Sequence, residues 1–183
     1  MRTGFLLATC LLTLPLAAQK AHPAAHAAAH PKTVVNWDGE WSRLAAKGDD
    51  LDQRIGDQVR DMNFALRLYW KKKLENACKA YDHLDILAGD SFSVALDKEP
   101  PIDTPADGTV VDWKNRDGDA FKASLTQDGP TLIQTLRGDG YTLQYVYSMR
   151  PDGKTLALEV TYTHPKLDSA FSYKLVFKRI ESD

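Results

Sequence analysis

The second half of the chain alternates apolar and polar residues, the pattern of a β-strand with one buried face. In the last such stretch, Phe171, Tyr173 and Phe177 alternate with Ser172 and Lys178. Similar alternation recurs from about residue 83 to residue 180. The pattern therefore predicts a series of strands that each have an apolar face and a solvent-exposed face.

Turn signals separate these strands at steady intervals. Pairs of glycine and aspartate recur at Gly89-Asp90, Asp107-Gly108, Asp117-Gly118, Asp128-Gly129, Asp139-Gly140 and Asp152-Gly153. This spacing is typical of strands joined by tight hairpins. A long meander with one apolar face must close on itself or be covered. We therefore predict a mainly β fold, an antiparallel up-and-down meander closed into a lipocalin-like barrel of about eight to ten strands.

A helical pattern precedes the strands, over residues 49–81. Apolar residues share one helical face at Leu51, Ile55, Val59, Met62, Leu66 and Tyr69. Asp49 or Asp50 is suited to cap the N-terminus. A single helix of this length would be roughly 45–50 Å long, which is long for so small a domain. We expect a break near Gly56 or near Met62-Asn63.

The N-terminus has the pattern of an export signal. Residues 1–18 comprise one positive charge, an apolar run with Pro15, and small residues at the end. Residues 19–32 are rich in alanine, histidine and proline, which indicates a flexible spacer before a domain at 33–183. We expect a periplasmic or secreted protein without an integral membrane segment after cleavage. Removal of Cys10 would leave Cys78 alone, so no intramolecular disulfide could form.

Charge gives little indication of a partner. The chain has 23 basic and 25 acidic residues, a net charge of −2. A near-neutral mixed surface argues against nucleic acid or an anionic membrane as an obligate partner.

Two short motifs resemble the lipocalin and fatty-acid-binding-protein superfamily, the calycins. Gly39-Glu40-Trp41 lies just before the helical segment, and Arg179 ends the last apolar alternation. In that superfamily a Gly-x-Trp on the first strand packs against an arginine from the last strand. The resemblance implies that Gly39, Trp41 and Arg179 close one end of the barrel through a cation–π contact. It also implies that the helical segment covers the barrel mouth.

Longer segments resemble the uncharacterised bacterial exported proteins of lipocalin-like type. The segments are Asp38 to Trp41, Asp49-Asp50, Pro151 to Leu156, and Tyr173 to Arg179. This chain lacks the disulfide that is common in secreted lipocalins, and its loops show no obvious family motif. The resemblance therefore implies a fold and an exported location, and it leaves the ligand open.

The inward faces of the predicted strands are rich in aromatic residues. As candidate ligand-binding residues we take Phe121, Tyr141, Tyr145, Tyr147, Tyr162, Phe171 and Tyr173. An unpaired buried hydroxyl costs roughly 1–3 kcal/mol, so five inward tyrosines are easier to satisfy in a cavity than in a dry core. Small barrels are nevertheless often filled by their own side chains, so both interiors are compatible with the pattern.

Catalytic and metal motifs are not evident. The core sequence contains His83 and His164, and no nucleophile, metal-protease or phosphate-loop motif accompanies them. The spacer histidines His22, His26 and His30 recur every four residues, but neighbouring prolines favour a plain spacer over a metal site. Cys78 falls at helical spacing from Trp70 and Leu74, which favours a buried, inert thiol. We expect no metal and no cofactor.

Three functions remain open at this point. The first is a non-enzymatic exported protein that holds a small lipophilic ligand in the barrel. The second is a filled barrel that acts as an envelope interaction or structural module, through the helical segment or the loop Lys98-Glu99-Pro100-Pro101. The third is an enzyme that uses His164 or His83 with loop carboxylates.

Overall fold

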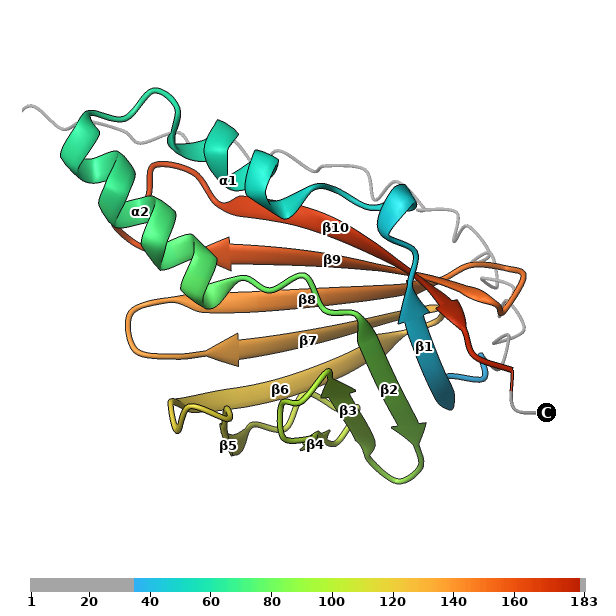
Figure 1. The fold of residues 1–183 in the computed structure, drawn as a ribbon. Coiled ribbons are helices and arrows are strands. Elements are labelled where there is room, and N and C mark those ends of the chain that lie inside the picture. The colour runs from blue at the N-terminus through green and yellow to red at the C-terminus, as the bar shows by residue number, and fades with distance from the viewer. Residues whose placement is uncertain (1–34, 182–183) are drawn as a thin grey trace, which may run out of the picture. The chain divides into compact units, whose positions relative to one another are not determined.

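Ten antiparallel strands form a single sheet that curls into a nearly closed barrel (Figure 1). The structure is a computed structural model and describes residues 35–181. The strand order is β4-β3-β2-β1-β10-β9-β8-β7-β6-β5, and two α-helices follow the first strand. The prediction of a mainly β, up-and-down barrel with a helical insert is therefore confirmed. The predicted signal and spacer, and their three histidines, lie outside the described residues.

The elements follow one another in a simple order. They are β1 (Gly39–Arg43), the 3-10 helix η1 (Ala45–Lys47), α1 (Leu51–Val59), α2 (Phe64–Ala77), β2 (His83–Ala88), β3 (Phe92–Leu96), β4 (Ile102–Thr104), β5 (Val111–Lys114), β6 (Ala120–Asp128), β7 (Thr131–Arg137), β8 (Thr142–Met149), β9 (Thr155–Thr163) and β10 (Phe171–Arg179). Each of β2 to β10 pairs with its sequence neighbour except at one place, and β1 lies between β2 and β10.

That exception is the step from β4 to β5, where the sequence predicts a hairpin at Asp107-Gly108. The hairpin prediction is wrong, because β4 and β5 are the two edges of the sheet and do not pair. Instead the loop between them bonds to β6: Gly108 N–H donates to the carbonyl of Leu125 at 2.9 Å, and Asp107 forms a bridge with Thr126. The barrel is consequently open along one seam.

The other Asp-Gly turns behave as ordinary hairpin turns. The glycines at positions 118, 129, 140 and 153 all have positive φ and lie in the turns that join β5 through β9 in succession. A positive φ is accessible to glycine at little cost, so these residues fix the hairpins and with them the strand register.

The helical segment consists of two helices separated at residues 60–63. The Asp50 carboxylate caps α1 by accepting a hydrogen bond from Gln53 N–H, and the Asn63 side chain caps α2 through Leu66 N–H. A capping side chain at Asn63 starts a new helix with a new orientation. The break therefore lies at Met62-Asn63 and not at Gly56, which is inside α1.

Because the helix restarts, the predicted apolar face does not continue across the break. Ile55 and Val59 of α1 are buried, whereas Leu66 and Tyr69 of α2 are about half exposed. Trp70 and Leu74 are the buried residues of α2 instead. The prediction of one continuous apolar stripe is thus wrong for its second half.

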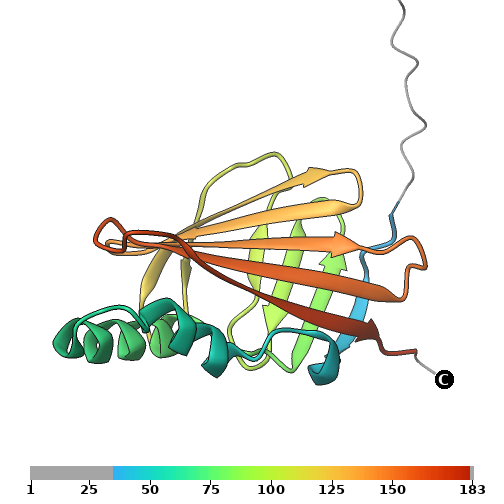
Figure 2. The same cartoon turned by 90° about the horizontal axis from the view of Figure 1, so that it is seen from above.

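The two helices lie side by side along one side of the barrel (Figure 2). α1 lies against the start of β10, where the Arg54 guanidinium donates to the carbonyl of Ser172 at 3.0 Å. α2 reaches the end of β9 through an edge-on contact of Trp70 with His164, whose ring centroids are 4.9 Å apart. We call this end of the barrel, with α2, the turn between β7 and β8 and the end of β9, the helical end.

The opposite end is formed by Gly39, Trp41 and Arg179, and we call it the closed end. Trp41 and Arg179 are paired across β1 and β10, and the Arg179 guanidinium carbon lies 4.4 Å from the Trp41 ring centroid. The guanidinium also donates to the backbone carbonyls of Asn36, Asp38 and Gly153.

Gly39 makes room for this guanidinium. Its φ is +144°, and a β-carbon at this position would lie 3.1 Å from Arg179 Nη1. A side chain here would therefore be strained by the backbone conformation and would crowd the arginine.

Candidate functional site

A cavity of about 520 Å³ lies at the helical end, between the C-terminal half of α2 and the inner faces of the strands. Its apolar wall is formed by Ala77, Val94, Leu96, Ile102, Leu136 and Leu143. Its aromatic wall is formed by Tyr81, Trp113, Phe121, Tyr141, Tyr145 and Tyr162. The interior is therefore not completely filled by the protein's own side chains.

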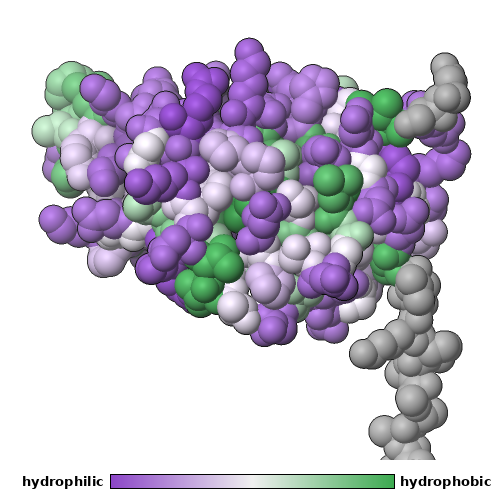
Figure 3. Space-filling view, turned by 90° about the horizontal axis from the view of Figure 1, so that it is seen from below, coloured by the Kyte–Doolittle hydropathy of each residue, from purple (hydrophilic) through white to green (hydrophobic). Residues whose placement is uncertain are grey.

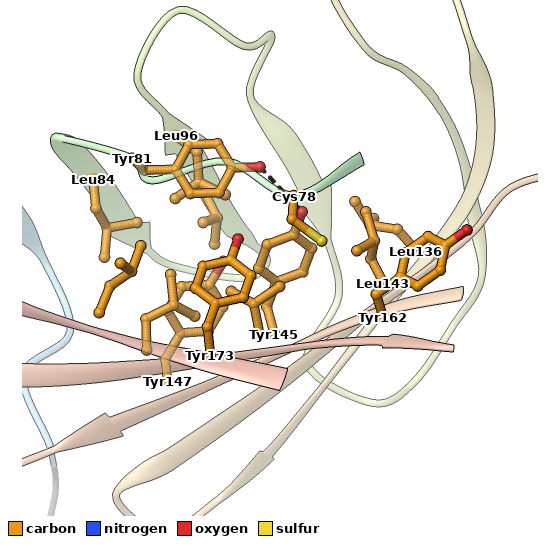
Figure 4. Packing of buried hydrophobic residues seen from close by; sticks show 14 of the residues in the cluster. Cys78, Tyr81, Leu84, Leu96, Leu136, Leu143, Tyr145, Tyr147, Tyr162 and Tyr173 are labelled. Atoms are coloured by element: carbon orange, nitrogen blue, oxygen red, sulfur yellow. Dashed lines mark hydrogen bonds between the residues drawn. The ribbon is translucent and has the colours of Figure 1, made fainter. Parts of the chain in front are cut away.

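Three of the wall residues form a row across adjacent strands. Leu136 of β7 is paired with Leu143 of β8, and Leu143 is paired with Tyr162 of β9. The row exists because strand register places inward residues of neighbouring strands directly opposite one another. In Figure 4 these three residues lie on the same side of the cluster, apart from the tyrosines at its centre.

The seven aromatic residues predicted to bind a ligand occupy two different places. Phe121, Tyr141, Tyr145 and Tyr162 line the cavity. Tyr147, Phe171 and Tyr173 are buried in the core but do not line it. Inward orientation is thus shared by all seven residues, whereas only four reach the void.

The three remaining aromatic residues have other contacts. The Tyr147 hydroxyl donates to the side-chain oxygen of Gln134 at 3.1 Å. The Tyr173 hydroxyl donates to the carbonyl of Lys79 at 2.7 Å and accepts from the Lys79 N–H at 3.1 Å. Phe171 packs against Tyr173 with ring centroids 5.8 Å apart. Tyr173 therefore fixes the connection between α2 and β2.

Four tyrosines line the cavity: the hydroxyls of two of them pair with each other, one hydroxyl is buried without a partner, and Tyr141 is partly exposed. Tyr81 and Tyr145 share a hydrogen bond of 3.2 Å, drawn as a dashed line in Figure 4. The Tyr162 hydroxyl is buried and has no hydrogen-bond partner within residues 35–181. Burial raises the pKa of Tyr162 to about 12 and the pKa of Tyr81 and Tyr145 well above the usual range. All three hydroxyls are consequently protonated at neutral pH.

Aromatic rings form a continuous row that follows the cavity wall and continues beyond it to α2. From β5 to α2 the successive neighbours are Trp113, Phe121, Tyr141, Tyr162, His164 and Trp70, each 4.9 to 6.3 Å from the next by ring centroid. The indole N–H of Trp113 also donates to the carbonyl of Pro100 at 3.2 Å, which ties β5 to the chain just before β4. Side chains thus bridge the open seam where backbone pairing is missing.

Charged side chains surround the cavity mouth but are absent from the buried interior. The mouth carries Lys73, Lys79, Glu99, Asp117 and Asp119. In the described part of the chain, no aspartate, glutamate, lysine, arginine or histidine is buried. The interior is therefore uncharged, with polar atoms supplied by tyrosine hydroxyls together with Gln134 and Thr104.

The sequence did not reveal three residues of this region. Tyr81 belongs to the predicted helix, but the helix ends at Ala77 and Tyr81 enters the cavity from the following segment. Trp113 lies on the short strand β5, whose alternation is too brief to be distinctive. Gln134 lies between Leu132 and Leu136 on the inward face of β7, and period-two counting over β7 would have found it.

In the described part of the chain, no carboxylate or nucleophile is hydrogen-bonded to the side chain of either core histidine or of Cys78. His83 is exposed, and His164 lies against Trp70 and Tyr162 while its Nδ1 accepts from the N–H of Lys166. Burial raises the pKa of the Cys78 thiol to about 12, which matches the predicted inert thiol. The described residues contain no group of histidine, cysteine and carboxylate side chains suited to a metal ion. Within 35–181, neither helix has the length and hydropathy of a membrane span.

Comparison with known proteins identifies the fold. No family model matches the chain, and no curated protein matches its sequence. A solved "REP1-NXSQ fatty acid transporter" superposes with a TM-score of 0.51 and 17% identity, over 80% of this chain and 97% of its own. A "secretary abundant heat soluble (SAHS) protein" from Ramazzottius varieornatus has a TM-score of 0.52 and 15% identity, over 81% and 98%.

A third structure supports the same conclusion. Fatty-acid-binding protein 1 of Echinococcus granulosus has a TM-score of 0.50 and 11% identity, over 79% of this chain and 98% of its own. Identities this low show a shared architecture and not a shared ligand. The chain therefore has the fold of a fatty-acid-binding-protein-like β-barrel.

Proposed function

We propose that this protein binds a small lipophilic molecule inside the barrel, without catalysing a reaction. The cavity at the helical end carries the proposal. Its volume of about 520 Å³ falls within the range of roughly 300–1,000 Å³ that is usual for ligand pockets. Its wall contains a continuous apolar and aromatic part, as ligand pockets generally do, and polar side chains such as Asn76, Asn115 and Asp117 also line it.

The names of the structural neighbours agree with this proposal. Two of the three are called a fatty acid transporter and a fatty-acid-binding protein. Since one fold serves many functions, the cavity is stronger support for a lipophilic ligand than the names of the neighbours. The site chemistry also agrees with the binding of a lipophilic molecule, because no charged side chain is buried in the described residues.

We further propose that the protein is exported. The support is the signal-like pattern of residues 1–18. Cell fractionation and intact mass measurement test this proposal directly. We expect an extracytoplasmic protein that begins near Gln19, and an intact cytoplasmic chain that begins at Met1 would contradict it.

Binding is tested by titration with Nile red, a neutral lipophilic dye whose emission shifts to the blue in apolar surroundings. We expect saturable binding of one dye per protein. In the variant Leu143→Trp, a larger side chain fills part of the cavity, so dye affinity should fall at least about tenfold.

The matched control is Gln144→Trp, which places the same side chain on the exposed face of the same strand. This control should bind the dye like the wild type. Thermal melting establishes that each variant is folded, and Leu136→Phe provides a second cavity-filling variant if Leu143→Trp is unstable. Equal dye affinity in wild type and in every folded cavity-filling variant would show that the cavity is not the binding site.

A further inference from the structure

The Tyr162 hydroxyl is the buried polar atom of the cavity lining that lacks a hydrogen-bond partner in the described residues. Within residues 35–181, five buried side-chain atoms have no hydrogen-bond partner: Trp37 Nε1, Trp41 Nε1, Thr104 Oγ1, Gln134 Nε2 and the Tyr162 hydroxyl. Of these residues, only Tyr162 lines the cavity. Leaving a buried hydroxyl unpaired is unfavourable, so this atom is suited to bond with a molecule that occupies the cavity.

Neighbouring rings hold Tyr162 in place. Tyr141 stacks on one side with centroids 5.3 Å apart, and His164 lies nearly parallel with centroids 6.3 Å apart. Its main chain is fixed by pairing with Leu143 and Phe171 on the adjacent strands. A ring constrained in this way can present its hydroxyl with little loss of conformational entropy.

Of the other tyrosines, Tyr141 is partly exposed and its hydroxyl can bond to water, whereas the hydroxyls of the buried tyrosines are already engaged. Tyr81 and Tyr145 bond to each other, and Tyr147 and Tyr173 bond outside the cavity lining to Gln134 and to the backbone of Lys79. A ligand oxygen would have to compete with these bonds, whereas at Tyr162 it would not. Tyr162 is therefore the best-placed donor.

The charges around the cavity disfavour an anion. The mouth carries two lysines and three carboxylates, and no cationic side chain is buried in the described residues. A carboxylate drawn into the interior would lose its hydration without gaining a buried cation, which is strongly unfavourable.

We propose that the cavity selects a neutral lipophilic molecule with a hydroxyl or carbonyl oxygen that accepts a hydrogen bond from Tyr162, and that it discriminates against free carboxylates. This proposal rests on the proposed function, since it specifies the ligand class of the same cavity. Burial raises the pKa of Tyr162 to about 12, so the hydroxyl remains a donor at neutral pH.

Lys73 is the residue that most directly opposes this proposal. It is half-buried on α2 at the cavity mouth and could attract an anionic head group. The variant Lys73→Met therefore distinguishes anion binding through Lys73 from selection of neutral ligands by the cavity. If anions bind through Lys73, decanoate affinity should fall in this variant, whereas we expect the affinity for neutral ligands to be unchanged.

The test is displacement of Nile red by two ten-carbon competitors, 2-decanone and decanoate, at pH 7.5. The ketone can only accept a hydrogen bond, and the decanoate is anionic. In wild type we expect 2-decanone to bind at least about tenfold more tightly than decanoate. In Tyr162→Phe, affinity for 2-decanone should fall about threefold to tenfold, as expected for one lost hydrogen bond.

Tyr147→Phe is the matched control, because it removes the hydroxyl of an inward tyrosine that does not line the cavity. Its preference for 2-decanone should equal that of wild type. Decanoate binding as tight as that of 2-decanone, or an unchanged ketone affinity in Tyr162→Phe, would overturn the proposed ligand class while leaving dye binding intact. Absence of binding by the dye and both competitors would instead overturn the proposed function itself, and the ligand class with it.

Discussion

The closed end and the helical end of the barrel differ in how completely side chains fill them. At the closed end, the guanidinium of Arg179 lies over the indole of Trp41 and donates hydrogen bonds to three backbone carbonyls. At the helical end, a cavity of about 520 Å³ remains between α2 and the strands. The difference arises because Trp41 and Arg179 fill the space beside the β1–β10 pair at the closed end, whereas α2 and the strands that it faces leave a void.

Because of this difference, we assign the stability of the protein mainly to the closed end and its proposed binding role to the helical end. Packing of large side chains at the closed end supplies stabilising contacts. The helical end contains the unfilled cavity, and the unpaired Tyr162 hydroxyl belongs to a residue that lines it. Substitutions at the closed end should therefore reduce stability, and substitutions around the cavity should mainly change binding.

The largest expected effect is at Trp41. Trp41→Ala should lower the free energy of unfolding by about 3–5 kcal/mol, since Trp41 is fully buried and its loss leaves a large void. Trp113→Ala is the comparison at the helical end. Because Trp113 is only partly buried, this substitution should lower the free energy of unfolding clearly less. Urea denaturation measures both values. An equal loss of unfolding free energy in the two variants would show that the two ends contribute equally to stability.

Loss of the guanidinium should have the next largest effect. Arg179→Met removes the cation–π contact and leaves the carbonyls of Asn36, Asp38 and Gly153 without their donor, at an expected cost of about 2–3 kcal/mol. Arg150→Met, at an exposed arginine in the turn between β8 and β9, should cost less than about 0.5 kcal/mol. Similar denaturation midpoints for the two variants would argue against a stabilising role of Arg179.

Alkaline pH should destabilise the fold through groups near the helical end. Burial raises the pKa of Cys78 from its ordinary value of 9.0 to about 12, and that of Tyr162 from 10.0 to about 12. Between these values the unfolded chain loses protons that the folded chain keeps, so stability is constant below about pH 9 and falls as pH rises. Each group contributes a slope of at most about 1.4 kcal/mol per pH unit.

The same pH dependence can be assigned to one group by substitution. Cys78→Ala should flatten the decline between pH 9 and pH 10, where Tyr162 still contributes little. Trp41→Phe, at the closed end, should lower stability equally at every pH. An unaltered pH profile in Cys78→Ala would mean that the thiol is not the group that titrates.

The smallest expected effect is at Tyr162 itself. Because its hydroxyl is buried without a partner, Tyr162→Phe should leave the stability of the ligand-free protein unchanged or slightly increased. Tyr147→Phe breaks the bond to Gln134 and should cost about 1 kcal/mol. Differential scanning calorimetry compares the two variants, and a clear loss of stability in Tyr162→Phe would indicate that its hydroxyl already has a partner.

The fold was largely predictable because its signals are periodic and local. Aspartate-glycine turns and period-two alternation specified the hairpins of β5 to β9, and the helix break was predicted at one of two places, of which Met62-Asn63 is the right one. The gap between β4 and β5 was not predictable, since Asp107-Gly108 has the same local sequence as the true hairpin turns. Whether two edges pair depends on the closure of the whole sheet, which no local signal contains.

The cavity was predictable only in part, for a related reason. Alternation identifies inward residues, so it grouped Tyr145 with Tyr147, although the second lies two positions deeper and bonds to Gln134. Depth along the barrel depends on where α2 covers the strands. The entry of Tyr81 from the segment after α2 likewise depends on where the helix ends, and helix ends are the least certain part of a sequence-based prediction.

The central claim is that the helical end is hollow and holds a small neutral lipophilic molecule. Native mass spectrometry of the protein purified from its own cells tests this claim most directly. We predict a population with one additional mass of a few hundred daltons, which is lost in Leu143→Trp and retained in Gln144→Trp. A bare protein mass in repeated preparations, with no adduct after incubation with Nile red or 2-decanone, would contradict it.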